Sequence, residues 1–577
     1  MKNPKIEAGK DELRAARRES RGLFWTVGLF SFFVNLLMLT GPLYMLQVYD
    51  RVLGSRSFET LFGLTLIVGF LYGMMGLLDF SRARIMARVG SRFQARLDQR
   101  VFDAVIRKSS IAPDESSATG LRDLESIQRL LISPPLMALF DMPWTPIFLA
   151  GILLFHPWLG YLAIGGGAIL ILLTILNQAT TRLPVARANM ATVQSEQISG
   201  QMVNEAEMVQ AMGMREASFH RWQTARDQAL RQSLAASDMG GLFSVLTKTF
   251  RLFLQSAMLG LGAYLVLVGE LSPGAMIAGS ILMGRALAPI ELAIGQWPLF
   301  QRAAKGWESL ALLLGTVPPE QPRTALPTPQ AKLEVQQLTL VPPGQSQATL
   351  RMVNFVVQPG QALGVIGTSG AGKSTLARAI TGLWRPAGGK IRLDGASIEQ
   401  YDPSVLGQLI GYLPQRVELF DGTIAENIAR LSPTPDAAKI VAAAKKADAH
   451  AMILKMPEGY DTRVAASGGR LSGGQIQRIG LARAMYSDPV ILVLDEPNSN
   501  LDNEGSQALN NAIRAMKSEG KSVLIMAHRP AAIQECDLLL MLDGGQVRAF
   551  GPKDDVLKKV VQNRQALARG DNQGGVQ

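Results

Sequence analysis

The chain has 577 residues, of which 47% are hydrophobic and only 18% are charged, and its formal net charge is +11. A charged fraction below the roughly 25% of globular proteins excludes a single soluble domain, and the length indicates several domains. The one cysteine excludes an internal disulfide framework, and the four scattered histidines have no metal-ligand spacing. Lysine and arginine cluster beside apolar segments, so a positive-inside membrane protein explains the basic balance better than nucleic-acid binding, for which no signature is present.

Six apolar stretches in the first half are each long enough to cross a bilayer, which takes about 20 residues. They lie near 23–48, 61–78, 136–155, 158–176, 252–268 and 275–296. One such stretch could be a buried helix of a soluble domain, but six at this spacing predict a transmembrane domain over residues 23–315. The first stretch is too long for a cleavable signal, so residues 1–22 are expected to form a retained N-terminal segment.

Arginines mark the two long loops, which follow the second and fourth stretches. They are Arg82, Arg84, Arg88, Arg92, Arg96 and Arg100 in one loop, and Arg182, Arg187, Arg215, Arg221, Arg226 and Arg231 in the other. The short loops hold only Arg51 and Arg56. The positive-inside rule therefore places the long loops, the N-terminus and the C-terminal half in the cytoplasm. Both loops are rich in helix formers, so spans two to five are expected to continue below the membrane as helices.

Several polar residues lie within or beside the spans: Asn35 in the first, Lys248 and Arg251 at the start of the fifth, and Arg285 and Glu291 in the sixth. Charges in a membrane are costly, which favours internal placement. Two interpretations of Arg285 and Glu291 stay open. They line a central path or pair across a subunit interface, or they satisfy each other statically.

Five arginines at four-residue intervals, from Arg84 to Arg100, form one helical stripe. The stripe is either a solvated surface that faces water or lipid headgroups, or a basic wall at the cytoplasmic entrance of a transport path.

Prolines crowd the start of the third span and predict a broken or kinked helix there. They are Pro134, Pro135, Pro143 and Pro146. The segment Asp141–Trp144 within this span looks specialised, but periodicity assigns it no function.

The second half begins with a proline-rich linker over residues 316–330. An α/β domain is expected over residues 331–570, followed by a disordered tail at 571–577. Within this domain short apolar strands alternate with helical stretches, which predicts a largely parallel sheet covered by helices.

A glycine-rich loop follows the apolar run Ala362–Ile366 and precedes a helical pattern that begins at Leu376. It fits the phosphate-loop pattern with Gly367, Thr368, Ser369, Gly370, Ala371, Gly372, Lys373, Ser374 and Thr375. Glycines let backbone N–H groups turn toward phosphates, and a helix N-terminus adds partial positive charge. We expect Lys373 to reach the β- and γ-phosphates of a nucleotide and the Ser374 hydroxyl to hold Mg²⁺. A chance glycine-rich turn is disfavoured by the strand before the loop and the helix after it.

Two carboxylates end the apolar strand that begins at Val490. The carboxyl ends of parallel strands lie beside the phosphate loop in this architecture. We expect Asp495 to hold Mg²⁺ through water and Glu496 to orient or deprotonate the attacking water. The alternative is an acidic turn after a core strand.

A second anion-binding device is predicted before the helical stretch Ile476–Met485. It consists of Ser472, Gly473, Gly474 and Gln475. Ser472 is a suitable N-cap, and a serine with two glycines at a helix N-terminus can bind phosphate.

Two neutral residues complete the candidate site. Gln415 can contact Mg²⁺ or the attacking water, and His528, which follows the apolar strand Ser522–Ala527, can contact the γ-phosphate. Neither would be chosen without the other motifs, because a lone histidine after a strand is usually structural.

Together these motifs resemble the ABC transporter family over nearly the whole chain. The resemblance implies an all-α six-helix transmembrane domain of exporter type and an α/β nucleotide-binding domain, with ATP as substrate and Mg²⁺ as cofactor. It also implies a dimer of half-transporters in which each ATP is held by one subunit's phosphate loop and the other's Ser472–Gln475. One chain has one copy of each motif. Homodimer and heterodimer both stay open.

Three segments are similar to type I protein secretion exporters: Pro42–Leu53, Phe140–Trp144 and Leu494–Asp502. The resemblance is strongest to the protease and lipase secretion branch. It implies an inner-membrane ATPase of a Gram-negative-type bacterium that works with a second copy of itself, a periplasmic adaptor, an outer-membrane channel and an unfolded secreted protein with a C-terminal signal. Export of peptides, lipids or drugs is the alternative. An ATP-gated channel or regulator is a further rival, which the intact set Asp495, Glu496, Gln415 and His528 disfavours.

One position departs from the family pattern. The family places an aromatic residue near the first strand of the nucleotide domain to stack on adenine, and alignment by eye puts Pro342 there. We therefore expect loose base selectivity, with ATP and GTP bound at similar affinity.

Overall fold

The computed structural model describes residues 4–112, 114–320, 323–465, 471–498, 501, 503–527 and 530–558. It divides into two compact units. The membrane unit comprises Met1–Lys108 with Asp114–Pro319, and the nucleotide unit comprises Ser109–Pro113 with Glu320–Gln577.

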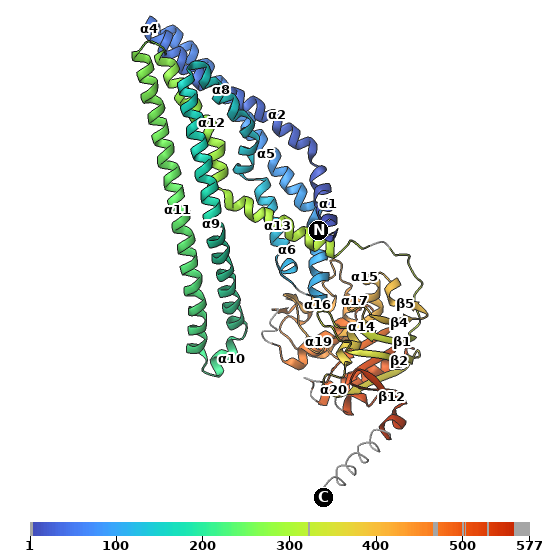
Figure 1. Cartoon of the computed structure of the whole chain (residues 1–577). Coiled ribbons are helices and arrows are strands. Elements are labelled where there is room, and N and C mark those ends of the chain that lie inside the picture. The colour runs from blue at the N-terminus through green and yellow to red at the C-terminus, as the bar shows by residue number, and fades with distance from the viewer. Residues whose placement is uncertain are drawn as a thin grey trace. The chain divides into compact units, whose positions relative to one another are not determined.

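The membrane unit is all-helical (Figure 1). Its helices are α1 (Pro4–Arg18), α2 (Arg21–Met38), α3 (Thr40–Gln47), a π-helical turn (Val48–Val52), α4 (Leu53–Ser55), α5 (Phe58–Ile111), α6 (Glu115–Leu131), α7 (Pro134–Asp141), a 3-10 turn (Met142–Trp144), α8 (Thr145–Phe155), α9 (Pro157–Asn204), α10 (Ala206–Ala211), α11 (Arg215–Leu267), α12 (Pro273–Gly295) and α13 (Trp297–Thr316). Figure 1 shows α9 and α11 running side by side, with α10 joining their ends.

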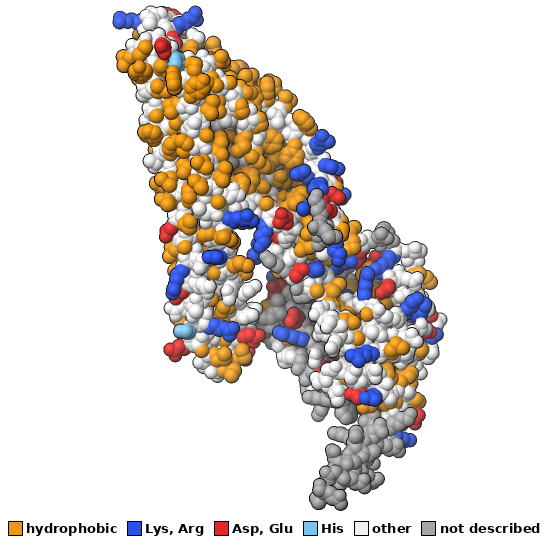
Figure 2. All heavy atoms as spheres, in the orientation of Figure 1, with side chains coloured by type: hydrophobic (Ala, Val, Ile, Leu, Met, Phe, Trp, Pro, Cys, Tyr) orange, Lys and Arg blue, Asp and Glu red, His pale blue; other side chains and the backbone are white. Residues whose placement is uncertain are grey.

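Six helical stretches among the described residues are long and apolar enough to cross a membrane, which confirms the six predicted spans. They are Arg21–Ser55, Phe58–Ile111, Pro134–Phe155, Pro157–Asn204, Arg215–Leu267 and Pro273–Leu292. Apolar side chains gather over the span-forming part of this unit, and Lys and Arg lie mainly beyond it (Figure 2). Helices of 48 to 54 residues are roughly 70–80 Å long, more than twice the hydrocarbon thickness. Thus α5, α9 and α11 continue well outside the membrane, as expected.

Two spans are interrupted. The third is broken into α7, a 3-10 turn and α8, as its prolines predict, because Pro143 and Pro146 lack the N–H that would continue α7. The first is one apolar stretch in the sequence, but α2 ends at Met38 and α3 starts at Thr40. Pro42 in the first turn of α3 explains this restart, since it has no N–H to donate.

The N-terminal helix α1 is fastened to α5 and α13. A Cβ at Gly9 would lie 1.9 Å from the Ala311 carbonyl oxygen, so only glycine allows this close crossing with α13. Arg100 on α5 binds Glu12 at 2.9 Å and donates to the Val317 carbonyl at 2.6 Å. This end of the arginine stripe therefore holds helices together and is not merely a solvated surface.

The nucleotide unit contains the predicted, largely parallel sheet. Its order is β12 (Gln546–Pro552), β11 (Leu538–Asp543), β3 (Ala362–Gly367), β10 (Ser522–Ala527), β9 (Ile491–Asp495) and β6 (Ile410–Leu413), with only β12 antiparallel. Every residue of β9 and β10 is buried, which explains their continuous apolar sequences.

A second sheet, which the sequence analysis did not predict, is antiparallel. It contains β2 (Leu350–Val357), β1 (Leu333–Leu340), β4 (Gly388–Leu393) and β5 (Ala396–Ser397), in that order. A two-stranded ribbon joins β7 (Gly422–Thr423) to β8 (Arg463–Val464). The helices are α14 (Lys373–Ile380), α15 (Pro403–Leu409), α16 (Ile424–Ile428), α17 (Ala437–Lys446), α18 (His450–Leu454), α19 (Gly473–Met485) and α20 (Asn503–Ser518).

The strand register brings the functional loops to one edge of the parallel sheet. Asp495, the last residue of β9, pairs with Met526 near the end of β10, and Ile366 of β3 pairs with Ala527. The carboxyl ends of β3, β9 and β10 therefore meet, which is where parallel sheets bind their ligands.

Candidate nucleotide-binding site

The loop between β3 and α14 can be built only with glycine at specific positions. At Gly367 a Cβ would lie 2.3 Å from the Leu542 carbonyl oxygen. Gly370 and Gly372 have φ of +80° and +100°, and a Cβ at Gly372 would also lie 2.6 Å from Leu350 Cδ2. The backbone of the loop therefore lies close to the sheet, and α14 begins directly after the loop, at Lys373.

Lys373 is a buried ammonium held by neutral oxygens of the loop itself. Its Nζ donates to the Gly367 carbonyl at 2.9 Å and to the Thr368 carbonyl at 3.0 Å. Burial lowers the pKa of Lys373, and the nearby Glu496 and Asp495 carboxylates act in the opposite direction. The free-energy cost of burying this ammonium would therefore be offset by an anionic phosphate bound beside it.

Ser374 and Asp495 form a pair of oxygen donors beside this cation. The Ser374 hydroxyl donates to Asp495 Oδ1 at 3.1 Å, and Asp495 is only 2% exposed. Burial raises the pKa of Asp495, while the hydrogen bond from Ser374 lowers it. A hydroxyl and a carboxylate are ligands that suit Mg²⁺, so these residues fit that ion.

Glu496 follows directly, and hydrogen bonds hold both its backbone and its side chain. Its backbone has a φ of +50°, and its N–H donates to the Met526 carbonyl at 2.9 Å. Gln415, two residues beyond β6, donates through Nε2 to Glu496 Oε2 at 2.9 Å. A non-glycine residue rarely adopts this backbone conformation. The surrounding hydrogen bonds therefore hold Glu496 in it and set the direction of its side chain.

The segment Ser472–Gln475 caps α19 as predicted. The Ser472 hydroxyl accepts from the Gln475 N–H at 3.3 Å, and Gln475 Oε1 accepts from the Ser472 N–H at 2.9 Å. Over the described part of the chain, no hydrogen bond joins this segment to the phosphate loop. His528, the remaining predicted contact, lies outside the described residues.

Sequence reasoning missed Gln477 on α19. This side chain is 2% exposed, and its Nε2 donates to the Pro497 carbonyl at 2.5 Å. It therefore links α19 to the residue after Glu496. A glutamine shortly before the apolar run from Ile479 to Ala482 was the signal available in the sequence.

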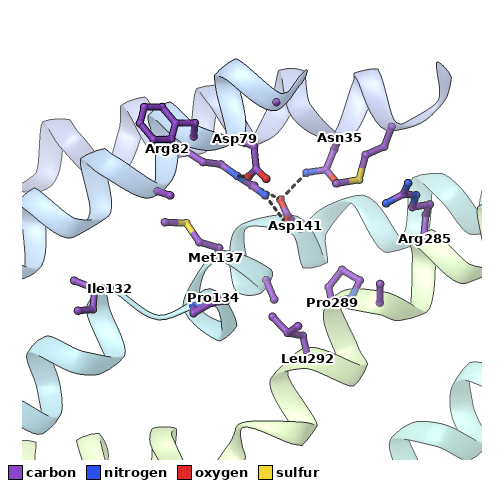
Figure 3. Close-up of a pocket in the computed structure, with 16 residues that line it drawn as sticks. Asn35, Asp79, Arg82, Ile132, Pro134, Met137, Asp141, Arg285, Pro289 and Leu292 are labelled. Atoms are coloured by element: carbon purple, nitrogen blue, oxygen red, sulfur yellow. Dashed lines mark hydrogen bonds and ion pairs between the residues drawn. The ribbon is translucent and has the colours of Figure 1, made fainter. Parts of the chain in front are cut away.

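The membrane unit also contains a buried polar cluster. Arg82 forms two bonds to Asp141, at 2.7 and 3.2 Å, and its Nε binds Asp79 at 2.6 Å (Figure 3). Asn35 donates to the same Asp141 at 2.7 Å. Asn35 and Asp141 drew attention in the sequence, but Arg82 was counted only as a loop arginine.

The two charges of the sixth span do not satisfy each other. Glu291 pairs with Arg251 of α11 at 3.4 Å, whereas Arg285 lines a cavity beside Asp141 (Figure 3). The static pairing of Arg285 with Glu291 is therefore wrong for this chain.

A phosphate loop, a buried Mg²⁺-type oxygen pair and a positioned glutamate, joined in one chain to six apolar spans, define a nucleotide-hydrolysing membrane transporter. Residues 350–499 match the model "ABC transporter", and residues 24–287 match "ABC transporter transmembrane region". The chain belongs to the ABC transporter family, and it is an ATPase whose hydrolysis is coupled to transport.

Named relatives cover nearly the whole chain. It is 44% identical to the type I secretion system ATP-binding protein PrsD of Rhizobium meliloti, over 96% of this chain and 95% of the relative. It is 28% identical to the leukotoxin export ATP-binding protein LtxB of Aggregatibacter actinomycetemcomitans, over 93% and 77%. A solved bacterial Atm1-family ABC exporter with ATP bound has the same fold, with a TM-score of 0.77, 22% identity, and coverage of 96% and 99%.

Proposed function

We propose that this chain is the ATP-hydrolysing subunit of a type I secretion system and exports unfolded proteins across the inner membrane. The observation that carries the proposal is the 44% identity to a type I secretion ATP-binding protein across nearly the full length of both chains. The protein would cross the membrane six times, with both termini in the cytoplasm, as the arginine-rich loops indicate.

Mg²⁺ would be held by Ser374 and Asp495, with Gln415 close by. When bound, it neutralises charge on the β- and γ-phosphates. Lys373 and the backbone N–H groups of Gly367–Thr375 bind the same phosphates. Lys373 would orient these phosphates and stabilise the charge on the transferred group.

Glu496 would act as the general base for the attacking water. Gln415 holds one of its carboxylate oxygens at 2.9 Å, so the carboxylate enters the reaction already oriented. His528 would contact the γ-phosphate. The α19 N-terminus would take its phosphate from the ATP of a second copy, with Ser472, Gly473, Gly474 and Gln475 facing that ligand.

The partners would be a second copy of this chain, a periplasmic adaptor, an outer-membrane channel and a secreted protein with a C-terminal signal. The test is co-expression of all four components and measurement of the secreted protein in the medium. Secretion is expected with the native chain and should stop with Glu496→Gln. Transport of a dye by the purified chain without any adaptor, together with no secretion, would instead favour a drug or lipid exporter.

A further inference from the structure

The arginines in the first half of the loop after the second span fall into two groups. Three are paired with carboxylates from other parts of the membrane unit: Arg82, Arg96 and Arg100. Three others on α5 are exposed and have no carboxylate partner among the residues that the structure describes: Arg84, Arg88 and Arg92. The charge of the second group therefore stays available to a ligand outside the helix bundle.

The face of α5 that carries Arg84 and Arg88 is apolar over the length of the span before them. Its large side chains recur at helical spacing and are 63–71% exposed: Phe62, Leu66, Phe70, Leu77 and Phe80. None of the most apolar 18 residues of α5 is buried inside the chain, whereas the other five spans bury 22–44% of theirs. This face is therefore suited to contact lipid, and the two arginines continue it by one and two helical turns.

The length of this apolar face places Arg84 and Arg88 at the level of lipid headgroups. From Phe62 to Phe80 the face is roughly 27 Å long, close to a hydrocarbon thickness of about 30 Å. Arg84 follows roughly 6 Å further along the helix. The side chain of Arg88 extends back toward the same level, because helical side chains tilt toward the helix N-terminus.

The exposed Trp25 of α2 marks the same level independently. Two contacts align α2 and the turn before it antiparallel to α5: Ser31 with Arg82 at 3.0 Å, and Glu19 with Arg96 at 3.1 Å. Trp25 lies six residues before Ser31, and Arg88 lies six residues after Arg82, so the two side chains start from one level. Trp25 is 71% exposed, and tryptophan is enriched where a membrane meets water.

An anionic phospholipid fits this face better than a second copy of the chain. Symmetric pairing of the face would bring two arginine stripes together, and like charges across an interface are unfavourable. A phosphodiester offers two oxygens that share one negative charge, which suits guanidinium groups. A zwitterionic headgroup such as phosphocholine carries its own cation, so an anionic headgroup should bind more tightly.

We propose that Arg84 and Arg88 bind the phosphate of an anionic phospholipid whose acyl chains lie along Leu77 and Phe80. The inference goes beyond the proposed export function and holds whichever cargo the chain transports. It selects the headgroup-facing interpretation of this end of the arginine stripe over a basic wall at a transport path.

The test compares phosphatidylglycerol and phosphatidylcholine with identical acyl chains on the purified full-length chain in detergent. Native mass spectrometry counts the lipids bound at each lipid concentration. Each arginine adds to the attraction for an anionic headgroup, so the first phosphatidylglycerol should bind about tenfold tighter than the first phosphatidylcholine. Equal affinity of the native chain for the two lipids would overturn the proposal, and this comparison requires no variant.

Variants locate the preference. Arg84→Gln combined with Arg88→Gln should reduce it to about twofold or less, whereas Arg84→Lys combined with Arg88→Lys should keep most of it because the charge is retained. The matched control is Arg221→Gln combined with Arg231→Gln on α11. It removes two exposed arginines that lie at least roughly 30 Å along the helix from Leu252, near the start of the fifth span, and should leave the preference unchanged. A preference that survives the Arg84 and Arg88 glutamine variant, or one that is lost in the control, would overturn the site.

The same variants are checked for folding by two measurements. Because both substituted side chains are exposed, ATP turnover and the midpoint of thermal unfolding in lipid-free detergent should equal those of the native chain. The lysine variant provides the same comparison without a change in net charge.

Two further experiments distinguish other occupants of this face. A photo-crosslinking residue in place of Leu77, in nanodiscs that contain phosphatidylglycerol, should capture lipid. Capture of a second copy of the chain instead would overturn the proposal. Soluble glycerol phosphate has no acyl chains to contact the apolar face, so even a large excess should not displace the bound lipid. Displacement would assign the two arginines to a free phosphate and would overturn the lipid site.

Discussion

The two units bury charge in different ways. In the nucleotide unit, Lys373 is buried against two backbone carbonyls and Asp495 against a serine hydroxyl. In the membrane unit, Arg82 and Asp141 are buried against each other. The Nζ of Lys373 donates to neutral carbonyls although the Glu496 and Asp495 carboxylates lie near it, so part of its charge stays available to a ligand. A buried charge that is paired with an opposite charge links the helices that carry the two side chains and attracts a ligand only weakly.

This difference distinguishes charged groups that bind a ligand from charged pairs that hold helices together. The comparison predicts that removing a charge at the nucleotide site changes nucleotide binding and ATP turnover. Removing a charge that is paired inside the membrane unit, such as Arg82, should instead change the free energy of unfolding.

The largest effect is expected for Glu496→Gln. Loss of a general base lowers turnover by about 10²–10⁴-fold, while ATP binding persists because the phosphate loop is untouched. Phosphate release and nucleotide binding by the purified chain measure the two quantities, and ATP should trap a closed dimer detectable by size. Turnover at the native rate would remove Glu496 from the mechanism.

Arg82→Leu is the corresponding test of the membrane cluster. It leaves Asp141 buried without its cation and should cost about 3–5 kcal/mol of stability. Arg82→Leu combined with Asp141→Leu should recover much of this, since no charge is stranded. Thermal unfolding in detergent measures both, with the exposed Arg84→Leu as control. If the double variant is no better than the single one, the two charges are not a structural pair.

The two units also differ in how much of each could be predicted from the sequence. The residues of the phosphate loop are contiguous, so the strand, loop and helix were predictable together. Asn35, Arg82 and Asp141 come from three helices, and no spacing along the chain reveals that they meet. The antiparallel sheet was missed because β1 and β4, which pair with each other, lie about fifty residues apart with the phosphate loop between them.

Gln477→Met tests a link within the nucleotide unit. It removes the bond to the Pro497 carbonyl and should let Glu496 lose its orientation. We expect turnover to fall about tenfold, with the KM for ATP nearly unchanged, since one buried hydrogen bond is lost. Steady-state kinetics separates the two constants. Gln408→Met, on the exposed face of α15, is the matched control, and a rise in KM alone would place Gln477 in binding instead of positioning.

Base selectivity should show a smaller effect. Pro342 is buried after β1, and residues 341–349 contain no aromatic side chain to stack on adenine. Stacking is worth about 1–3 kcal/mol per base, so without it ATP and GTP should bind within about threefold of each other. Competition binding measures this ratio. A strong preference for ATP would show that another part of the chain recognises adenine.

The smallest effect on ATP turnover is expected for substitution of Cys536, a buried group that lies away from the nucleotide site. This thiol lies in the core and not at the ligand-binding edge, and burial raises its pKa from 9.0 to about 12, with charged side chains such as Lys553 and Asp537 nearby. Because the folded state holds the proton more tightly, the thiol contributes stability that is present below pH 9 and is lost as the pH rises toward 12. Cys536→Ala should leave turnover within about twofold between pH 7 and 9 and should flatten the loss of stability above pH 9. Thermal unfolding across this range measures the slope. A changed pH profile of turnover would show that this core thiol affects the nucleotide site.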